Sequence, residues 1–303
     1  MIDDRAALRS RLGRVGVWTF AFDARSAADV RMDVREIESL GYPALWVPEG
    51  LSSRDIFAHM SLLLATTDRI AVCSGIANIT ARAPEVMANG IRTIADAYGD
   101  RPVFGIGVGH QYTTASRDLE WDHPVERMRS YLDRMDATRA NSPEPSVPAR
   151  RLLAALRPRM LALSAERAMG AHTYFVPAEH TARARSILGP EPVLAVELTA
   201  VVRGERDAMH RTARGFAAHY LELPNYANNL RWLGFGDDDV AGGGSDRMID
   251  SIFAFGSAEA VAARVLEHLD AGADHVCIQV ISGDDSDVCL PQLRDLAPAV
   301  LRL

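Results

Sequence analysis

The chain has 303 residues and a mass of 33.0 kDa, with 48% hydrophobic and 24% charged residues, the composition of an ordinary folded protein. All 33 basic residues are arginine, which excludes chemistry that needs a lysine amine, such as Schiff-base catalysis and the phosphate-binding P-loop. The net charge of -7 argues against a nucleic-acid partner, because such proteins concentrate basic residues on one face.

The cysteines and the hydropathy of the chain indicate the cellular compartment in which we expect the protein. Three cysteines without a CxxC pair favour a reducing compartment. The acidic N-terminus is unlike a signal peptide, and no apolar run approaches the length of a membrane span. We therefore expect a cytoplasmic protein without a membrane partner.

Short apolar or β-branched runs alternate along the chain with longer segments of helical periodicity. The first helical segment, 27–40, follows Ser26 as N-cap and stops at Gly41, while Pro84 and Pro124 each mark a later helix start. Eight runs are predicted to be strands: 15–20, 44–48, 70–76, 103–108, 152–156, 172–176, 193–202 and 275–281.

This alternation without a composition break predicts one domain, residues 1–303, folded as a single (β/α)₈ TIM barrel, because each parallel strand needs a crossover that a helix fills. A doubly wound open sheet is the alternative. Residues 109–150 and 204–256 exceed the usual connection length, so we expect extra helical segments after strands 4 and 7. Residues 141–148 are too proline-rich for a helix, and 242–246 predict a mobile loop leading into one.

The ends of the second and third strands carry the first candidate site residues, since barrel chemistry sits at the C-terminal ends of strands. Glu49 would stand at the barrel mouth, unless it is a solvated loop acid. Gly75 permits unusual backbone geometry or the close approach of a ligand, although a bulge without function is equally ordinary.

The fourth strand ends with glycines at alternate positions, Gly105, Gly107 and Gly109, which would leave the backbone bare for a flat or anionic ligand. Their spacing differs from the dinucleotide-binding fingerprint, and residues 111–114 do not promise the helix that this fingerprint requires. His110 follows, where a histidine can act as acid or base near neutral pH or be inert.

The fifth strand is followed by Arg157 and Arg159 on either side of Pro158, which forms a candidate anion site at a helix start or only a charged helix start. No metal is predicted, because the histidines form no HExxH motif and His210 and His219 fall on opposite helix faces. No Gly-x-Ser-x-Gly elbow indicates a hydrolase nucleophile.

These strand-end motifs, in this order, resemble the luciferase-like flavin and deazaflavin oxidoreductases, in particular the actinobacterial branch that uses coenzyme F420. The resemblance runs from about Val15 to the last helix. Four segments carry it: GYPALWVPE (41–49), SGIANI (74–79), GIGVGH (105–110) and AGADHV (271–276).

The resemblance implies a (β/α)₈ barrel whose third strand ends in a bulge behind the deazaflavin ring, often with a non-prolyl cis peptide, here at Gly75–Ile76. It implies that the fourth strand end lies along the cofactor and that the helix start at Arg157 receives its phosphate or acidic tail. The residues so implied for cofactor binding are Trp18, Ser74, Gly75, Ile76, Ala77, Asn78, Gly107, Val108, Gly109, Arg157, Pro158, Arg159 and Met160.

One departure from the family affects the direction of the reaction. F420-dependent sugar-phosphate and alcohol dehydrogenases carry a histidine where this chain has Gly50, and alcohol oxidation needs a base. The resemblance therefore implies an F420H2-dependent reductase that gives a hydride to an activated C=C, C=N or C=O group of a small molecule, with His110 or Glu49 supplying the proton. An FMN-dependent monooxygenase and a non-catalytic flavin-binding protein are the alternatives, and a homodimer is left open.

Overall fold

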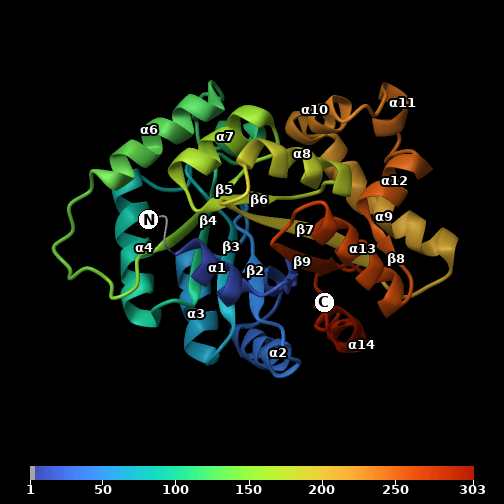
Figure 1. Cartoon of the computed structure of the whole chain (residues 1–303), viewed down its shortest axis with the longest axis horizontal. Coiled ribbons are helices and arrows are strands. Elements are labelled where there is room, and N and C mark those ends of the chain that lie inside the picture. The colour runs from blue at the N-terminus through green and yellow to red at the C-terminus, as the bar shows by residue number, and fades with distance from the viewer. Residues whose placement is uncertain (1–3) are drawn as a thin grey trace.

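Eight parallel strands close a barrel in the computed structural model, which describes residues 4–303 (Figure 1). β1 pairs with both β2 and β9, and β6 pairs with β7, so the ring has no open edge. This confirms the barrel and excludes the open sheet. The barrel strands are β1 (Val15–Trp18), β2 (Ala44–Val47), β3 (Ala71–Asn78), β4 (Pro102–Gly107), β5 (Arg150–Ala154), β6 (Gly170–Thr173), β7 (Val193–Val201) and β9 (His275–Val280).

Helices surround the barrel, and additional helices follow the fourth and the seventh strand. The predicted start of α2 is confirmed, because the Ser26 side chain accepts a hydrogen bond from the Asp29 N–H, and Gly41 beyond its end has φ +94°. The helices are α1 (Arg5–Leu12), η1 (Ala21–Ala24), α2 (Ala27–Ser39), α3 (Ile56–Thr66), α4 (Pro84–Tyr98), α5 (Gln111–Ala115), α6 (Pro124–Asp136), α7 (Pro158–Arg167), α8 (Ala178–Leu188), α9 (Arg206–Leu221), α10 (Pro224–Trp232), α11 (Asp237–Val240), α12 (Asp246–Ile252), α13 (Ala258–Asp270) and α14 (Leu290–Val300).

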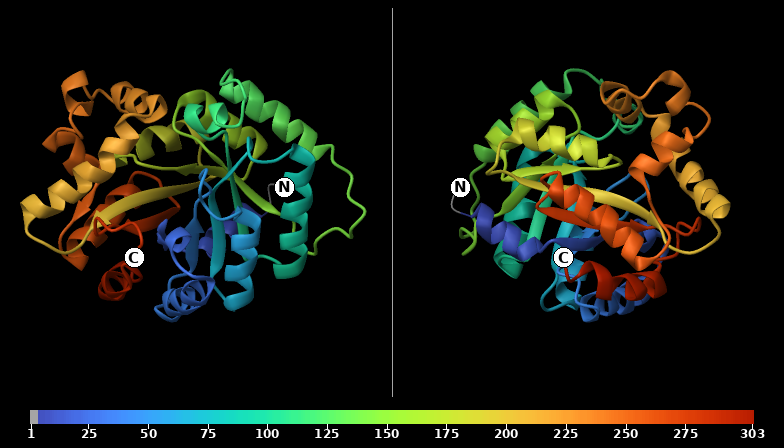
Figure 2. Two further views of the ribbon diagram at one scale, coloured as in Figure 1. Left: turned by 180° about the vertical axis from the view of Figure 1, so that it is seen from behind. Right: turned by 45° about the vertical axis from the view of Figure 1, so that its right-hand side comes forward.

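The extra segments after the fourth and seventh strands are confirmed. α5 precedes α6, and α9 to α12 form a group that projects on one side of the barrel, in orange in Figure 2. This group has its own hydrophobic core, in which Leu230 and Ile249 pack with Phe175 from the end of β6. The short strand β8 (Ala254–Phe255), which was not predicted, pairs with the end of β7 and returns the chain to the barrel.

The helix α5 corrects one sequence inference, which was that residues 111–114 do not form a helix. Their hydroxyl groups supply the missing helix start: Thr113 Oγ1 accepts from the His110 N–H at 3.0 Å and donates to the His110 carbonyl at 2.8 Å. Thr114 Oγ1 donates to the same carbonyl. These side-chain bonds to the His110 backbone fix the turn from which α5 begins.

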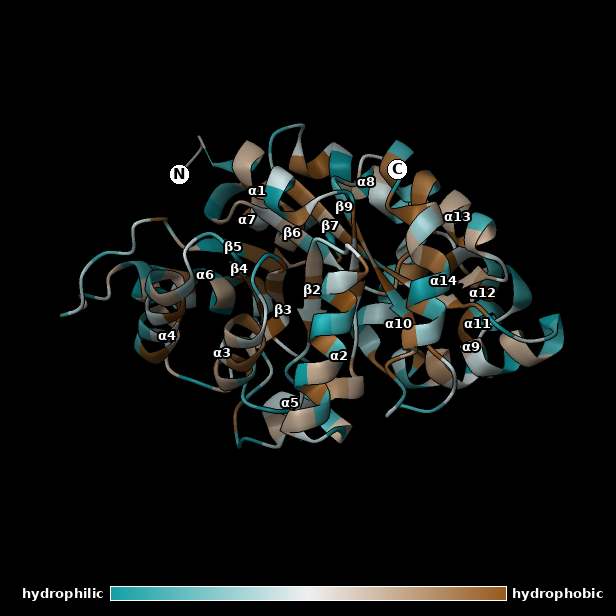
Figure 3. Cartoon of the chain, turned by 90° about the horizontal axis from the view of Figure 1, so that it is seen from below, coloured by the Kyte–Doolittle hydropathy of each residue, from teal (hydrophilic) through white to brown (hydrophobic). Residues whose placement is uncertain are grey.

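Two hydrophobic layers hold the barrel. One lies between the strands and the helices, and Figure 3 shows brown hydrophobic residues along the strands and both colours on the surrounding helices. The other fills the barrel itself, where Trp46, Cys73 and Cys277 pack with Leu8 and Leu12 of α1. The helix α1, which was not predicted, therefore covers one end of the barrel interior.

Glu197 on β7 is a carboxylic acid in this apolar setting, with 1% of its surface exposed. Its oxygens accept hydrogen bonds from Thr199 Oγ1 at 2.5 Å and from the Phe175 N–H at 3.1 Å. Burial raises the pKa of Glu197 to about 7, because the charged form loses its hydration.

We predict that Glu197 makes the fold less stable as pH rises. An acid whose pKa is raised by folding holds its proton more tightly in the folded state, so its contribution is lost as pH rises toward and through 7. Urea unfolding at pH 5 and pH 8 should show that Glu197→Gln loses less stability over this interval than the natural chain, by about 2.5 kcal/mol. The exposed Glu120→Gln is the control, and equal losses for all three proteins would contradict the prediction.

Candidate active site

A cavity of about 1100 Å³ opens at the C-terminal ends of the barrel strands. Glu49, Gly75, Gly109 and Arg157 all line it, so the predicted common mouth is confirmed. The volume exceeds that of a typical pocket for one drug-sized ligand, which leaves room for a cofactor and a substrate together. The sequence-predicted residues that line it are Trp18, Glu49, Gly75, Ile76, Asn78, Val108, Gly109, His110, Arg157, Pro158, Arg159 and Met160.

Three residues implied for cofactor binding are not on the cavity wall in the part of the chain that the structure describes. Ser74 is buried and its Oγ donates to the Gly105 carbonyl at 2.9 Å. Ala77 is buried in the layer between strands and helices. Gly107 faces the side chain of Ile76, whose Cδ1 would lie 2.5 Å from a Cβ at position 107. Their positions are explained by packing between β3 and β4, so direct contact with a ligand is not supported.

The bulge implied at the end of β3 is present. The register between β3 and β4 shifts between Ser74 and Ala77, and the Gly75–Ile76 peptide bond is cis. A Cβ at position 75 would lie 2.6 Å from Trp18 Nε1 and 3.4 Å from His172 Nε2, so only glycine fits between these two rings. The backbone of the bulge is thereby presented to the cavity.

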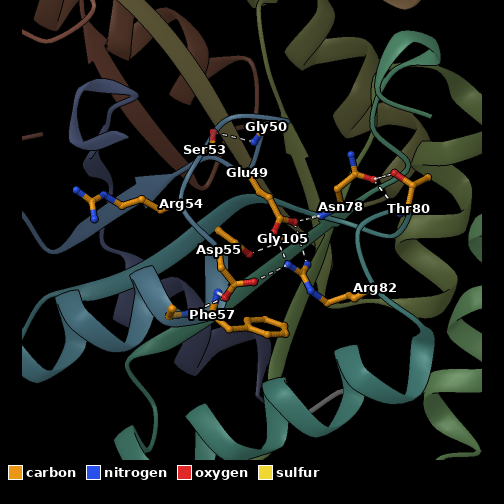
Figure 4. A network of polar contacts seen from close by, with 12 residues as sticks. Glu49, Gly50, Ser53, Arg54, Asp55, Phe57, Asn78, Thr80, Arg82 and Gly105 are labelled. Carbon is orange, nitrogen blue, oxygen red and sulfur yellow. Dashed lines mark hydrogen bonds and ion pairs between the residues drawn. The ribbon is translucent and has the colours of Figure 1, made fainter. Parts of the chain in front are cut away.

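Glu49 lies at the cavity but is held by an ion pair that the sequence did not indicate (Figure 4). Its Oε2 accepts from Arg82 Nη1 at 2.9 Å and from the Asn78 N–H at 2.8 Å, and Arg82 Nη2 donates to Oε1. The two side chains are 6% and 8% exposed. Because both oxygens act as acceptors, this arrangement favours a structural role for Glu49, which joins the ends of β2 and β3, over donation of a proton.

Removing Arg82 should therefore destabilise the whole protein. Arg82→Met leaves the Glu49 carboxylate buried without its partner, which typically costs about 3 to 5 kcal/mol. Arg134→Met is the matched control, since Arg134 pairs with Glu85 on the surface, where such pairs contribute less than about 1 kcal/mol. Chemical denaturation of both variants checks this prediction, and losses of similar size would show that the Glu49–Arg82 pair is not a structural anchor.

His110 is half-buried on the cavity wall at the start of α5. Its Nδ1 lies 3.3 Å from Asn225 Oδ1, and because an amide oxygen only accepts, Nδ1 carries the ring proton. Within residues 4–303, Nδ1 is the ring nitrogen of His110 that makes a hydrogen bond. Burial lowers the pKa of His110, so the ring is neutral at pH 7 with Nε2 free to accept a proton.

The two predicted arginines at α7 differ in their availability. Arg159 forms an ion pair with Glu126 on the surface. Arg157 is exposed at the N-cap of α7 and makes no side-chain hydrogen bond or ion pair within the described chain. The helix N-terminus and the free guanidinium together form a site suited to an anion at the edge of the cavity.

Sequence reasoning missed most of the aromatic residues on the cavity wall. Tyr174 directly follows β6, so the strand-end rule could have found it. Tyr112, Tyr220 and Tyr226 come from α5, α9 and α10. No spacing in the sequence relates these helices to the barrel mouth, and the same is true of Asn225, the partner of His110.

Comparison with protein families matches residues 14–275 to the luciferase-like monooxygenases. The chain belongs to the luciferase-like monooxygenase family. The match covers the barrel from β1 to β7 and stops at the first residue of β9.

Two curated relatives of this family member are 5,10-methylenetetrahydromethanopterin reductases. The enzyme of Archaeoglobus fulgidus is 28% identical over 100 residues, which are 33% of this chain and 30% of the reductase. The enzyme of Methanolobus tindarius is 25% identical over 88 residues, 29% of this chain and 27% of that one. The matched segments thus span less than a third of these relatives.

Solved structures share the fold over nearly the whole chain. An F420-dependent secondary alcohol dehydrogenase in complex with an F420-acetone adduct has a TM-score of 0.74 at 14% identity, covering 95% of this chain and 99% of that one. The F420-dependent tetrahydromethanopterin reductase from Methanopyrus kandleri has a TM-score of 0.73 at 15% identity, with coverages of 95% and 98%.

A flavin enzyme is among the similar structures as well. The oxygenating constituent of 3,6-diketocamphane monooxygenase from Pseudomonas putida, in complex with FMN, has a TM-score of 0.69 at 15% identity and coverages of 94% and 95%. Both cofactors, F420 and FMN, are therefore represented among proteins of this fold. In residues 4–303, no helix is both long and apolar enough to cross a membrane.

Proposed function

We propose that this family member is an F420-dependent oxidoreductase, working as a reductase that passes a hydride from reduced deazaflavin to an activated C=C, C=N or C=O group of a small molecule. The observation that carries the proposal is the convergence of the Gly75–Ile76 bulge, Gly109 and the free Arg157 on one cavity. The F420-dependent proteins among its structural neighbours support the choice of cofactor.

The residues at the bulge fit a flat ligand with a polar edge. Trp18 Nε1 and His172 Nε2 are buried, with their residues 2% and 3% exposed, and neither atom has a hydrogen-bond partner in the described chain. The His172 Nδ1 lies 3.2 Å from the Ala195 carbonyl and so carries the proton, which leaves Nε2 as an acceptor beside the Trp18 donor. Unpaired buried polar groups cost free energy, so this donor and acceptor support a polar ligand at Gly75.

The preference for F420 over FMN is attributed to the positive charge of Arg157 at the edge of the cavity. When bound, F420 supplies hydride chemistry and reacts poorly with oxygen, whereas reduced flavin reacts with it. Arg157 and the N-terminus of α7 would hold the phosphate or the acidic tail of the cofactor.

Titration of the purified protein with F420 and with FMN tests this choice. Arg157→Ala should weaken F420 by about 10-fold to 100-fold, because a charge-assisted contact contributes roughly 1.5 to 3 kcal/mol, and should weaken FMN less. Arg159→Ala should have a smaller effect, since Arg159 already pairs with Glu126. Arg129→Ala, which breaks a surface pair with Glu166 outside the cavity, is the control. Tight FMN binding with rapid oxygen consumption after reduction would instead favour the monooxygenase function.

Proton transfer is assigned to Nε2 of His110. Asn225 holds Nδ1 and so leaves Nε2 as the titrating atom. In reduction the protonated ring donates from Nε2, and in alcohol oxidation the neutral ring accepts there. His110 thus serves the proposed reduction from a strand end other than the one at which the related dehydrogenases carry a histidine.

The pH dependence of turnover tests the role of His110. Because only the protonated ring can donate, the reductive kcat should fall as pH rises through the pKa of His110, which burial places below 6.5. Asn225→Asp puts a carboxylate beside Nδ1, raises this pKa and should move the fall to higher pH. Asn228→Asp adds the same charge on the same helix without contacting His110 and should shift the profile less.

Removal of the His110 imidazole tests the same role through the turnover rate. His110→Ala should reduce turnover by about 10²-fold to 10⁴-fold while the affinity for F420 stays nearly unchanged. An alanine variant with near-normal turnover across the pH range would exclude His110 as the donor.

A further inference from the structure

We infer that the substrate part of this cavity binds an uncharged, planar aromatic molecule whose reducible group is conjugated to the ring. The inference rests on the proposed function, because it assigns the part of the cavity at Gly75 and Arg157 to the cofactor, with Trp18 at the boundary between the two parts. It is carried by a continuous row of aromatic side chains, by the absence of unpaired charge beside them and by the position of His110 within the row.

The row, here called the aromatic wall, consists of seven rings that all line the cavity. It begins with Phe20 and Trp18 at the end of β1, whose ring centroids are 4.3 Å apart, and continues from Trp18 to Tyr174 at 5.2 Å. Further along, Tyr220 and Tyr226 are separated by 5.1 Å. The complete wall is Phe20, Trp18, Tyr174, Tyr220, Tyr226, His110 and Tyr112.

The wall is built from five separate parts of the chain and still forms one surface. Tyr174 joins the β1 side to α9, with its ring centroid 5.3 Å from that of Tyr220. His110 joins α10 to α5, at 5.7 Å from both Tyr226 and Tyr112. Phe20, Tyr174 and His110 are only half-buried, so part of each ring is left facing the cavity. Aromatic area of this kind is best covered by another flat ring.

The charged side chains that line the cavity are either exposed to solvent or paired with an opposite charge. Of the charged residues that line the cavity, Glu49 is paired with Arg82, and Arg157, Arg159 and Glu222 are exposed. The wall itself is neutral, because burial raises the pKa of Tyr174 and Tyr220 and lowers that of His110. A charged group placed against the wall would lose its hydration without a counter-charge, so the wall selects an uncharged ligand.

Two of the four tyrosine hydroxyls of the wall, those of Tyr174 and Tyr220, make hydrogen bonds within the protein. Tyr174 Oη donates to Gln279 Oε1 at 2.7 Å, so the contact with Tyr220 Oη at 3.0 Å has Tyr220 as donor. Both protons are used inside the protein. The rings are tilted to one another, with interplanar angles of 67° for Trp18–Phe20 and 89° for Tyr220–Tyr226, so the wall offers both faces and edges to an aromatic ligand.

His110 fixes which part of the ligand reacts. Its ring is nearly parallel to that of Tyr112, with an interplanar angle of 7°, and its free Nε2 is the proton-transfer atom proposed above. A ring stacked along the wall brings a group attached to that ring next to Nε2. An aryl carbonyl, or a C=C or C=N bond conjugated to an aromatic ring, satisfies this geometry.

Binding of matched probes to the protein saturated with F420 tests the inference by calorimetry. The probes are 2-naphthaldehyde, its saturated analogue decahydro-2-naphthaldehyde, and the anion 6-formyl-2-naphthoate. We expect 2-naphthaldehyde to bind about tenfold more tightly than either of the others, since they lose planarity or gain a charge. Equal or tighter binding of the saturated aldehyde or of the anion would overturn the inference.

Substitutions within the wall separate substrate from cofactor. Tyr112 is 44% exposed, so Tyr112→Leu removes its ring without opening the core. Tyr112→Leu and Tyr226→Leu should each reduce the preference for the planar probe to within about threefold and leave the Kd for F420 unchanged. Tyr98→Leu on α4, outside the cavity, is the control and should change neither. If these substitutions weaken the binding of F420 and of the probe equally, the wall belongs to the cofactor site and the inference is overturned. If F420 does not bind the natural chain, the proposed function is overturned instead.

Discussion

The close approach of β4 to the bulge of β3 is the constraint on which the site depends. A Cβ at position 105 would lie 2.2 Å from the Ser74 carbonyl oxygen, and one at position 109 would lie 2.3 Å from Asn78 Nδ2. Real side chains do not approach so closely, so glycine is required at these positions by the neighbouring strand. The alternate glycines thus exist to accommodate the bulge, and only Gly109, with φ +72°, also lines the cavity.

A second set of interactions holds the bulge from its other side. Glu49, at the end of β2, accepts from the backbone of Asn78 just beyond the bulge, and Arg82 completes the pair. The bulge is therefore fixed between a carboxylate on β2 and a glycine-bearing strand β4. A ligand that rests on Gly75 meets a surface whose shape is set before binding, which lowers the entropic cost of recognition.

The sequence predicted those features that depend on local chemistry. The cap at Ser26, the strand ends and the barrel itself follow from patterns within a few residues of each other. The sequence could not indicate the roles of Arg82, Asn225 and Tyr226, because these roles arise only when segments distant in the chain are brought together. The expectation for residues 111–114 was wrong for a different reason, because the Thr113 hydroxyl bonds back to the His110 backbone, a contact that the usual Glu or Gln pattern of helix starts does not include.

The helical group α9 to α12 has a consequence for how this scaffold can diversify. It packs around its own core and contributes Tyr220, Asn225 and Tyr226 to the cavity, whereas Gly75 and Gly109 belong to the barrel. The two sides of the cavity thus belong to two modules that fold around different cores. Exchange of the helical module between homologous barrels would replace the rings that face the cavity, together with the Asn225 contact to His110, while the bulge at Gly75 stays intact.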